Sequence, residues 1–520
     1  MRSTKLVFFL QFFSKFVEFA NRRSISGMYS FIISVAALLL GYMFYGKFVE
    51  RIFGPSPARP TPAMAHPDGV DFVPMPLWKI YMIQFLNIAG TGPIFGAIMG
   101  AKFGPSAYLW IVFGCIFAGA VHDYFTGMIS IRHDGAGFPE LVGRYLGEGT
   151  KRVMLVFSLI LLLLVGAVFV YSPALILGDI APLAGSGSFA SIMFWVAVVL
   201  IYYVIATLLP IDKIIGRIYP LFAFALLFMA FALMIGLFVK WPHIPELWNG
   251  IQNMGPSVGV KGQPIFPCLF ITIACGAVSG FHATQSPLMA RCMKNEKYGR
   301  PVFYGAMITE GIVALVWAAV SSYFFIDGKA AEVGSSISAQ APEVVTKVSE
   351  GWLGLLGGIL ALLGVVAAPI TSGDTALRSA RIIVAEFFKY DQKKIKNRLV
   401  VAIPLFCISG LMLWYNVADP NGFNKVWSWF GWANQTLAVF MLWTVTSYLV
   451  RVGKGHRYLI TLLPAAFMTS VVTTFICVSG IGLGLPSEWS LPIGASVFAV
   501  AILLWYMWYF NFTSRKDITE

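Results

Sequence analysis

The sequence carries few charged residues for its length. Asp, Glu, Lys and Arg make up 12% of its 520 residues, whereas soluble globular proteins carry about 25%. This shortage excludes an ordinary soluble globule. A mean hydropathy of +0.77 and repeated apolar runs of about twenty residues predict an all-α polytopic membrane protein.

Signatures of catalysis and redox chemistry are also missing. The chain has no HExxH, GxSxG or GxxxxGK[ST] motif, so we predict neither an enzyme of those classes nor a primary pump. An intramembrane enzyme built on His282 and Glu310 has no catalytic motif behind it. The six cysteines form no CxxC pair and lie mostly in apolar runs, which indicates buried small hydrophobes. We therefore expect no bound metal and no cofactor.

Apolar segments divide the chain into five regions. We expect an interfacial segment or an extra short span at 1–26, and then a span at 27–45 with a polar connection to residue 76. Two spans at about 456–480 and 490–511, with a short tail, fill 451–520. Between them, the ranges 77–239 and 265–450 each hold five segments, which are 77–101, 106–129, 152–172, 190–209 and 216–239, then 265–289, 302–325, 353–386, 398–416 and 426–450.

Helix breakers interrupt the first and the sixth segment of this series of ten. Because each break heads a group of five, and five is odd, the second group enters the membrane from the opposite side. Two interrupted helices at matching places in two halves are a pointer to the binding site of a transporter. We predict a LeuT-like five-plus-five inverted repeat, with one extra N-terminal and two extra C-terminal helices.

The formal charge of +13 lies in short loops between the spans. Lys and Arg concentrate after the even-numbered segments, which predicts that these loops face the cytoplasm. This distribution fits a lipid bilayer as the partner and indicates no nucleic-acid binding. The oligomeric state leaves no signal in the sequence.

The two breaks supply the predicted substrate site. Freed carbonyls of a broken helix can hold a cation, and the N-terminus of a half-helix can hold an anion. A close-packed glycine face is the alternative for the first break, and interhelical hydrogen bonding is the alternative for the amides near residue 434. The substrate-binding candidates are Gly90, Thr91, Gly92, Pro93, Gly276, Ser279, Gly280, His282, Gln285, Asn434 and Gln435.

Ionisable and hydroxyl side chains inside other spans supply the predicted coupling site. An ionisable residue within a membrane segment is a functional hypothesis by default. The hydroxyls of adjacent Thr and Ser are suitable ligands for a small cation. A structural ion pair of Asp374 with Arg378 is the alternative at i, i+4. The candidates for coupling of H⁺ or Na⁺ are Asp123, Glu310, Thr371, Ser372 and Asp374.

Six motifs together resemble the carbon starvation protein A family, which includes bacterial peptide and pyruvate transporters. They are DGVDFVP at 68–74, IAGTGP at 88–93, AGAVHD at 118–123, ACGAVSGFH at 274–282, TSGDTALRSAR at 371–381 and GWANQTL at 431–437. Longer members carry a His-His pair where this chain has Gln84 and Phe85, so it resembles a short-form member. The resemblance implies a multi-pass transporter of the bacterial inner membrane, related to the amino acid–polyamine–cation superfamily and its inverted repeat.

These observations predict an ion-coupled secondary transporter that imports a small carboxylate such as pyruvate, or short peptides, by alternating access. A membrane sensor that binds a metabolite without transporting it is the alternative. The lack of any soluble output domain argues against the sensor.

Overall fold

The described part of the chain is helical throughout. The structure is a computed structural model that describes residues 27–519 except 184, 186–187, 209–214, 252, 255–262, 326–340, 393 and 419–421. The interfacial segment predicted for 1–26 lies outside the described residues. Nine described helices are long and apolar enough to cross a membrane, or ten if one bent pair counts as a single span.

The first span is longer than the apolar run that predicts it. Helix α2 (Tyr29–Leu40) passes through a π-helical turn, η1 (Gly41–Tyr45), into α3 (Gly46–Phe53). The predicted run ended at residue 45, because the charged residues after it interrupt the hydropathy but do not interrupt the helix. A short helix, α4 (Pro62–Ala65), follows in the polar connection.

The first group of five opens with a broken helix, as predicted. Helix α5 (Leu77–Ile88) ends before the Gly-Thr-Gly-Pro stretch and bends by 51° into η2, α6 and η3. Pro93 has no N–H to donate and cannot continue the hydrogen bonding of the preceding turn. The elements of the group after α5 are η2 (Gly92–Gly96), α6 (Ala97–Gly100), η3 (Ala101–Phe103), α7 (Ser106–Gly114), η4 (Cys115–Gly119), α8 (Ala120–Arg132), α9 (Phe138–Leu146), α10 (Glu148–Ile180), α11 (Phe189–Leu208) and α12 (Ile215–Lys240).

The second group repeats this order. Helix α13 (Ile265–Thr272) stops, the chain runs without helix to Gly280, and α14 (Phe281–Ala290) resumes. After the turns η7 (Glu296–Tyr298) and η8 (Arg300–Gly305) come α15 (Ala306–Phe325), α16 (Ala341–Phe387), α17 (Ile395–Ala418) and α18 (Gly422–Arg451). Helix α16 is kinked at Gly354, which has a φ of 62°. The predicted start at 353 therefore marks this kink.

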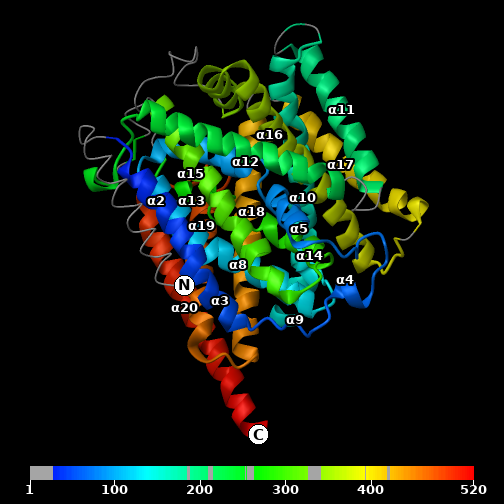
Figure 1. The fold of residues 1–520 in the computed structure, drawn as a ribbon. Coiled ribbons are helices and arrows are strands. Elements are labelled where there is room, and N and C mark those ends of the chain that lie inside the picture. The colour runs from blue at the N-terminus through cyan, green and yellow to red at the C-terminus, as the bar shows by residue number, and fades with distance from the viewer. Residues whose placement is uncertain are drawn as a thin grey trace, which may run out of the picture.

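Burial separates central helices from lipid-facing ones. The apolar windows of Ser106–Arg132 and Glu296–Phe325 are each 83% buried, against 17% for Ser487–Thr513. Of the last two long helices, α19 (Leu459–Val478) and α20 (Ser490–Thr519), α20 runs along one edge of the bundle and ends beyond it, whereas α8 and α18 lie in the middle (Figure 1). Any polar group on α8 or α15 must therefore be satisfied inside the protein.

Candidate substrate and coupling site

The two helix breaks lie against each other at the centre of the bundle. A Cβ placed on Gly92 would collide with Cys275 in the other break, so only glycine allows this approach. Gly96, four residues after Gly92, faces the carbonyl of Thr272. Gly100, four residues further on, faces the side chain of Ile273. The predicted glycine stripe therefore packs against the second break, which is the alternative that the sequence left open.

Two adjacent amides of α18 satisfy the backbone of the second broken helix. The side-chain oxygen of Asn434 accepts hydrogen bonds from the backbone N–H of Phe281 at 2.6 Å and from the Ser279 hydroxyl at 3.1 Å. Gln435 donates from Nε2 to the carbonyl of Phe270 at 2.8 Å, near the end of α13. Asn434 thus caps the start of one half-helix, and Gln435 binds the end of the other.

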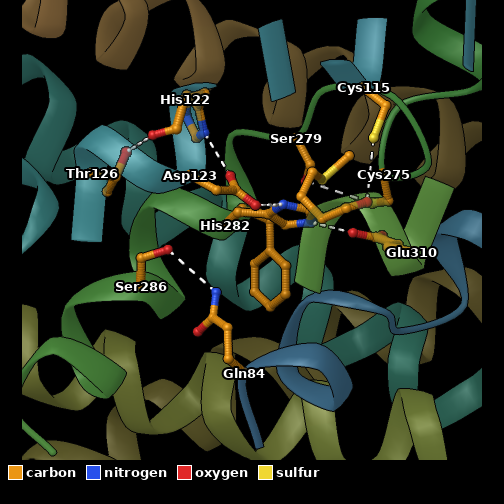
Figure 2. Close-up of polar contacts among 12 residues, drawn as sticks. Gln84, Cys115, His122, Asp123, Thr126, Cys275, Ser279, His282, Ser286 and Glu310 are labelled. Atoms are coloured by element: carbon orange, nitrogen blue, oxygen red, sulfur yellow. Dashed lines mark hydrogen bonds and ion pairs between the residues drawn. The ribbon is translucent and has the colours of Figure 1, made fainter. Parts of the chain in front are cut away.

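A chain of fully buried ionisable groups crosses the bundle beside the breaks. Asp123 on α8 binds Nδ1 of His122 and Nδ1 of His282, each at 2.8 Å. Nε2 of His282 lies 3.5 Å from Oε2 of Glu310 on α15. Figure 2 shows the His282 ring between the two carboxylates, one on each side. Three helices that are distant in sequence therefore bring together three of the predicted site residues.

The orientation of His282 follows from its partners. An ionised carboxylate can only accept hydrogen bonds, so Nδ1 of each histidine donates to Asp123. Nε2 of a neutral His282 then carries a lone pair directed toward Glu310. Among the described residues, neither this nitrogen nor either oxygen of Glu310 has a hydrogen-bond partner.

The predicted coupling residues of α16 face two different neighbours. The Ser372 hydroxyl donates to the carbonyl of Leu86 at 3.1 Å, next to the first break, and a Cβ on Gly90 would lie 3.1 Å from that hydroxyl. The Thr371 hydroxyl instead donates to carbonyls of its own helix. Ser372 therefore joins α16 to the end of α5 at the first break, and its role in holding an ion stays a prediction.

Asp374 points away from that break, toward α12. Its Oδ2 accepts a hydrogen bond from the Tyr219 hydroxyl at 2.6 Å. Arg378 donates to the carbonyl of Ala206 at 2.5 Å and lies 3.8 Å from Asp71. Among the described residues, the closest partner of the Asp374 carboxylate is thus Tyr219 of α12.

One polar face of α5 was missed by the sequence analysis. Gln84 and Asn87 are fully buried on one face of α5, and Thr91, a predicted site residue, is fully buried just after the break that ends this helix. Within the described part of the chain, both polar atoms of the Asn87 side chain and the Thr91 hydroxyl lack a hydrogen-bond partner. Gln84 donates weakly to Ser286 of α14 at 3.4 Å (Figure 2). The available signal was an Asn and a Gln inside an apolar segment, which is the signal that indicated Asn434 and Gln435.

Gln285, another predicted substrate residue, lies deeper in α14. Its Nε2 donates to the Thr284 hydroxyl at 2.9 Å and to the Ser379 hydroxyl of α16 at 3.4 Å. Its side-chain oxygen has no hydrogen-bond partner. The residue therefore links α14 to α16 and keeps one acceptor available.

One apolar groove among the described residues lies apart from the predicted site. It has a volume of about 630 Å³ and is lined by side chains of α7, α13 and α19, among them Trp110, Phe270 and Phe467. No predicted site residue lines it. Several residues that line it are exposed, among them Phe113 at 56% and Leu463 at 55%, which fits contact with lipid and does not mark a carboxylate site.

Taken together, the paired broken helices and the buried ionisable chain define a membrane transporter of LeuT-like fold. A manganese transporter of Eremococcus coleocola, solved in complex with an aromatic bis-isothiourea substituted compound, superposes with a TM-score of 0.53. The superposition covers 86% of this chain and 99% of that chain at 11% identity. At this identity the likeness shows the fold alone.

The family is shown by sequence. The model of the carbon starvation protein CstA matches residues 26–194, 181–354 and 345–476, and the chain belongs to this family. An uncharacterized membrane protein of Haemophilus influenzae is 49% identical over 57% of this chain and 91% of its own length. The peptide transporter CstA of Escherichia coli is 25% identical over 87% of this chain and 81% of its own length.

A second Escherichia coli relative is named pyruvate/proton symporter BtsT. It is 25% identical over 86% of this chain and 81% of its own length. The chain is accordingly a multi-pass transporter of the bacterial inner membrane. The predicted resemblance and fold class are both confirmed.

Proposed function

We propose that this chain imports a small carboxylate, such as pyruvate, together with a proton, by alternating access. The observation that carries the proposal is the buried chain Asp123–His282–Glu310, which lies beside the contact between the two breaks. Support for the substrate class comes from the relative named as a pyruvate/proton symporter.

Proton coupling follows from the cost of burying this chain. Two carboxylates and one imidazole have no access to water here, since all three side chains are fully buried. Ionised groups in such a place are costly, and a proton taken up by Glu310 or His282 removes part of that cost. The imidazole of His282 is suited to this exchange because its ring carries both a proton donor and an acceptor.

The substrate carboxylate has its best partners on the first break. Asn434 already accepts from the N–H of Phe281 at the start of α14, so this half-helix is capped from within. The Asn87 amide and the Thr91 hydroxyl have no partner and are fully buried. We propose that these two donors, with the backbone of Gly90 and Gly92, bind the carboxylate.

Sodium is a second candidate for the coupling ion. Ser372 and the carbonyl of Leu86 lie together at the first break, and hard oxygen ligands of this kind suit a small cation. Asp374 faces α12, so it would neutralise such an ion only from a distance.

Uptake of radiolabelled pyruvate into proteoliposomes, with pH and Na⁺ gradients imposed independently, tests the proposal. We expect accumulation driven by an inward proton gradient and insensitive to Na⁺. Glu310→Gln keeps the side-chain volume but not the exchangeable proton, so it should abolish accumulation while pyruvate exchange across the membrane persists. His456→Ala, at an exposed turn, is the matched control and should accumulate pyruvate normally.

Each other outcome has a defined meaning. Accumulation driven only by Na⁺ contradicts proton coupling and favours the Ser372 site. Uptake of di- or tripeptides that excludes pyruvate contradicts the substrate. Substrate binding without flux under any gradient would favour the sensor.

A further inference from the structure

A cysteine that the proposed function does not use lies beside the ionisable chain. Cys275 sits in the second break, and its sulfur, a ring nitrogen of His282 and a carboxylate oxygen of Glu310 all lie within 4.8 Å of one another. We infer that Cys275, His282 and Glu310 form a binding site for one divalent transition-metal ion of the Zn²⁺ class. The inference concerns binding and does not rest on the proposed transport.

The spacing of these atoms is close to that of a coordination shell. Tetrahedral Zn²⁺ holds nitrogen and oxygen ligands at about 2.0–2.1 Å, which places two such ligands about 3.4 Å apart. Nε2 of His282 and Oε2 of Glu310 are 3.5 Å apart. A sulfur ligand at about 2.3 Å would lie about 3.6 Å from either. From the 4.8 Å limit, the sulfur needs to approach each of the other two ligand atoms by no more than about 1.2 Å, which a side-chain rotation supplies.

His282 and Glu310 offer unused lone pairs, whereas the sulfur of Cys275 has two weak contacts, with the Asn434 amide at 3.7 Å and the Ser279 hydroxyl at 3.6 Å. His282 donates from Nδ1 to Asp123 at 2.8 Å, which leaves Nε2 as the free acceptor. In the part of the chain that the structure describes, Nε2 and both oxygens of Glu310 lack hydrogen-bond partners although they are fully buried. A carboxylate that binds the far nitrogen of a ligating histidine is the usual outer partner of a protein-bound metal, because it fixes the tautomer and raises the basicity of the ring.

The donor set selects the class of metal. One thiol, one imidazole and one carboxylate form the mixed sulfur, nitrogen and oxygen set that Zn²⁺ accepts, whereas Mg²⁺ and Ca²⁺ require oxygen ligands. The side-chain amide of Asn434 contacts the sulfur of Cys275 at 3.7 Å and would stabilise a thiolate there. The carboxylates of Asp123 and Glu310 supply further negative charge for a divalent cation.

Metal and proton would occupy the same side chains. His282 and Glu310 cannot hold a coupling proton and a metal ion together, so we expect Zn²⁺ to inhibit any proton-driven transport. Binding and transport are nevertheless measured separately, so either proposal can fail without the other.

The test uses the full chain, purified in detergent and incubated with Zn²⁺ or Co²⁺ before unbound ions are removed. We expect one ion per chain by plasma mass spectrometry, and a thiolate-to-cobalt charge-transfer band with Co²⁺. The Cys275→Ser variant should lose that band. Both Cys275→Ser and Glu310→Gln should bind Zn²⁺ at least about tenfold more weakly than the wild-type chain. Asp123→Asn should weaken Zn²⁺ binding about 10- to 100-fold, because Asp123 orients the His282 ring. Cys292→Ser alters another buried cysteine, outside the cluster, and serves as the matched control.

Three results would overturn the inference. They are the lack of stoichiometric metal on the wild-type chain, metal binding that Cys275→Ser and Glu310→Gln leave unchanged, and bound Co²⁺ without the thiolate band. If size-exclusion chromatography shows that a variant does not fold, zinc-edge X-ray absorption of the wild-type protein tests the ligand set instead. It must show one sulfur neighbour at about 2.3 Å.

Discussion

Replacement of Asn434 by alanine tests whether this amide stabilises the second broken helix. Its oxygen is the acceptor for the N–H of Phe281 and for the hydroxyl of Ser279, and all three residues are buried. A buried donor left without a partner costs about 1–3 kcal/mol, and loss of an N-cap costs about 0.5–2 kcal/mol. The two terms overlap in part, so we expect the free energy of unfolding to fall by about 2–3 kcal/mol.

The neighbouring residues of α18 grade this effect. Gln435→Ala removes one donor to a carbonyl, which retains a second lone pair, so about 1 kcal/mol is expected. Thr436→Ala is the control, because its hydroxyl bonds only to the carbonyl of Trp432 in its own helix. It should change stability by no more than about 0.5 kcal/mol.

Thermal unfolding of the purified variants in one detergent, followed by tryptophan fluorescence, gives the ranking. The expected order of destabilisation is Asn434→Ala, then Gln435→Ala, then Thr436→Ala. If Asn434→Ala unfolds at the temperature of the Thr436→Ala control but loses substrate binding, the cap reasoning fails and Asn434 contacts the substrate instead.

Two further substitutions have defined outcomes. If Asp374 takes part in coupling, as its place inside a span predicts, Asp374→Asn should abolish pyruvate accumulation in proteoliposomes even though the proposed proton site lies at Glu310. The melting temperature should stay nearly unchanged, because the amide oxygen can still accept from Tyr219. Uptake at the wild-type level would remove the coupling role. Gly280→Ala places a Cβ against the backbone of Asn434 and should lower the unfolding free energy by about 1–3 kcal/mol. Gly410→Ala, where no atom lies within 4 Å, should be neutral or stabilising by up to about 1 kcal/mol, and equal behaviour of the two glycine variants would contradict the packing argument.

The fold could be predicted because a membrane restricts it strongly. The length of each apolar run predicts a membrane span, and the pair Gly92 and Pro93 predicts the first break. Both predictions depend only on residues that are neighbours in the sequence. The ends of helices were less accurate. The first span continues to Phe53, and α16 begins at Ala341, because charged or polar residues end a hydropathy run without ending a helix.

The site was predicted by residue type but not by arrangement. Asp123, His282 and Glu310 were singled out because ionisable groups are rare in spans, yet their mutual contacts depend on how three helices pack. The same limit applies to Asp374, whose i+4 neighbour Arg378 is visible in the sequence while Tyr219 of α12 is not. Gln84 and Asn87 were not selected as site residues, although Asn434 and Gln435 of α18 were. Isolated amides in a span also commonly form structural hydrogen bonds between helices.

The tight contact between the two breaks bears on how strongly a substrate can bind. Gly92 and Cys275 leave no room for even one methyl group between them, so a carboxylate held between the breaks must first separate the two half-helices. The apparent affinity is then the intrinsic affinity multiplied by the fraction of protein in the separated form. Each 1.4 kcal/mol needed for separation therefore lowers the apparent affinity about tenfold. A variant that favours separation would therefore bind substrate more tightly, because more of the free protein is already in the binding-competent form.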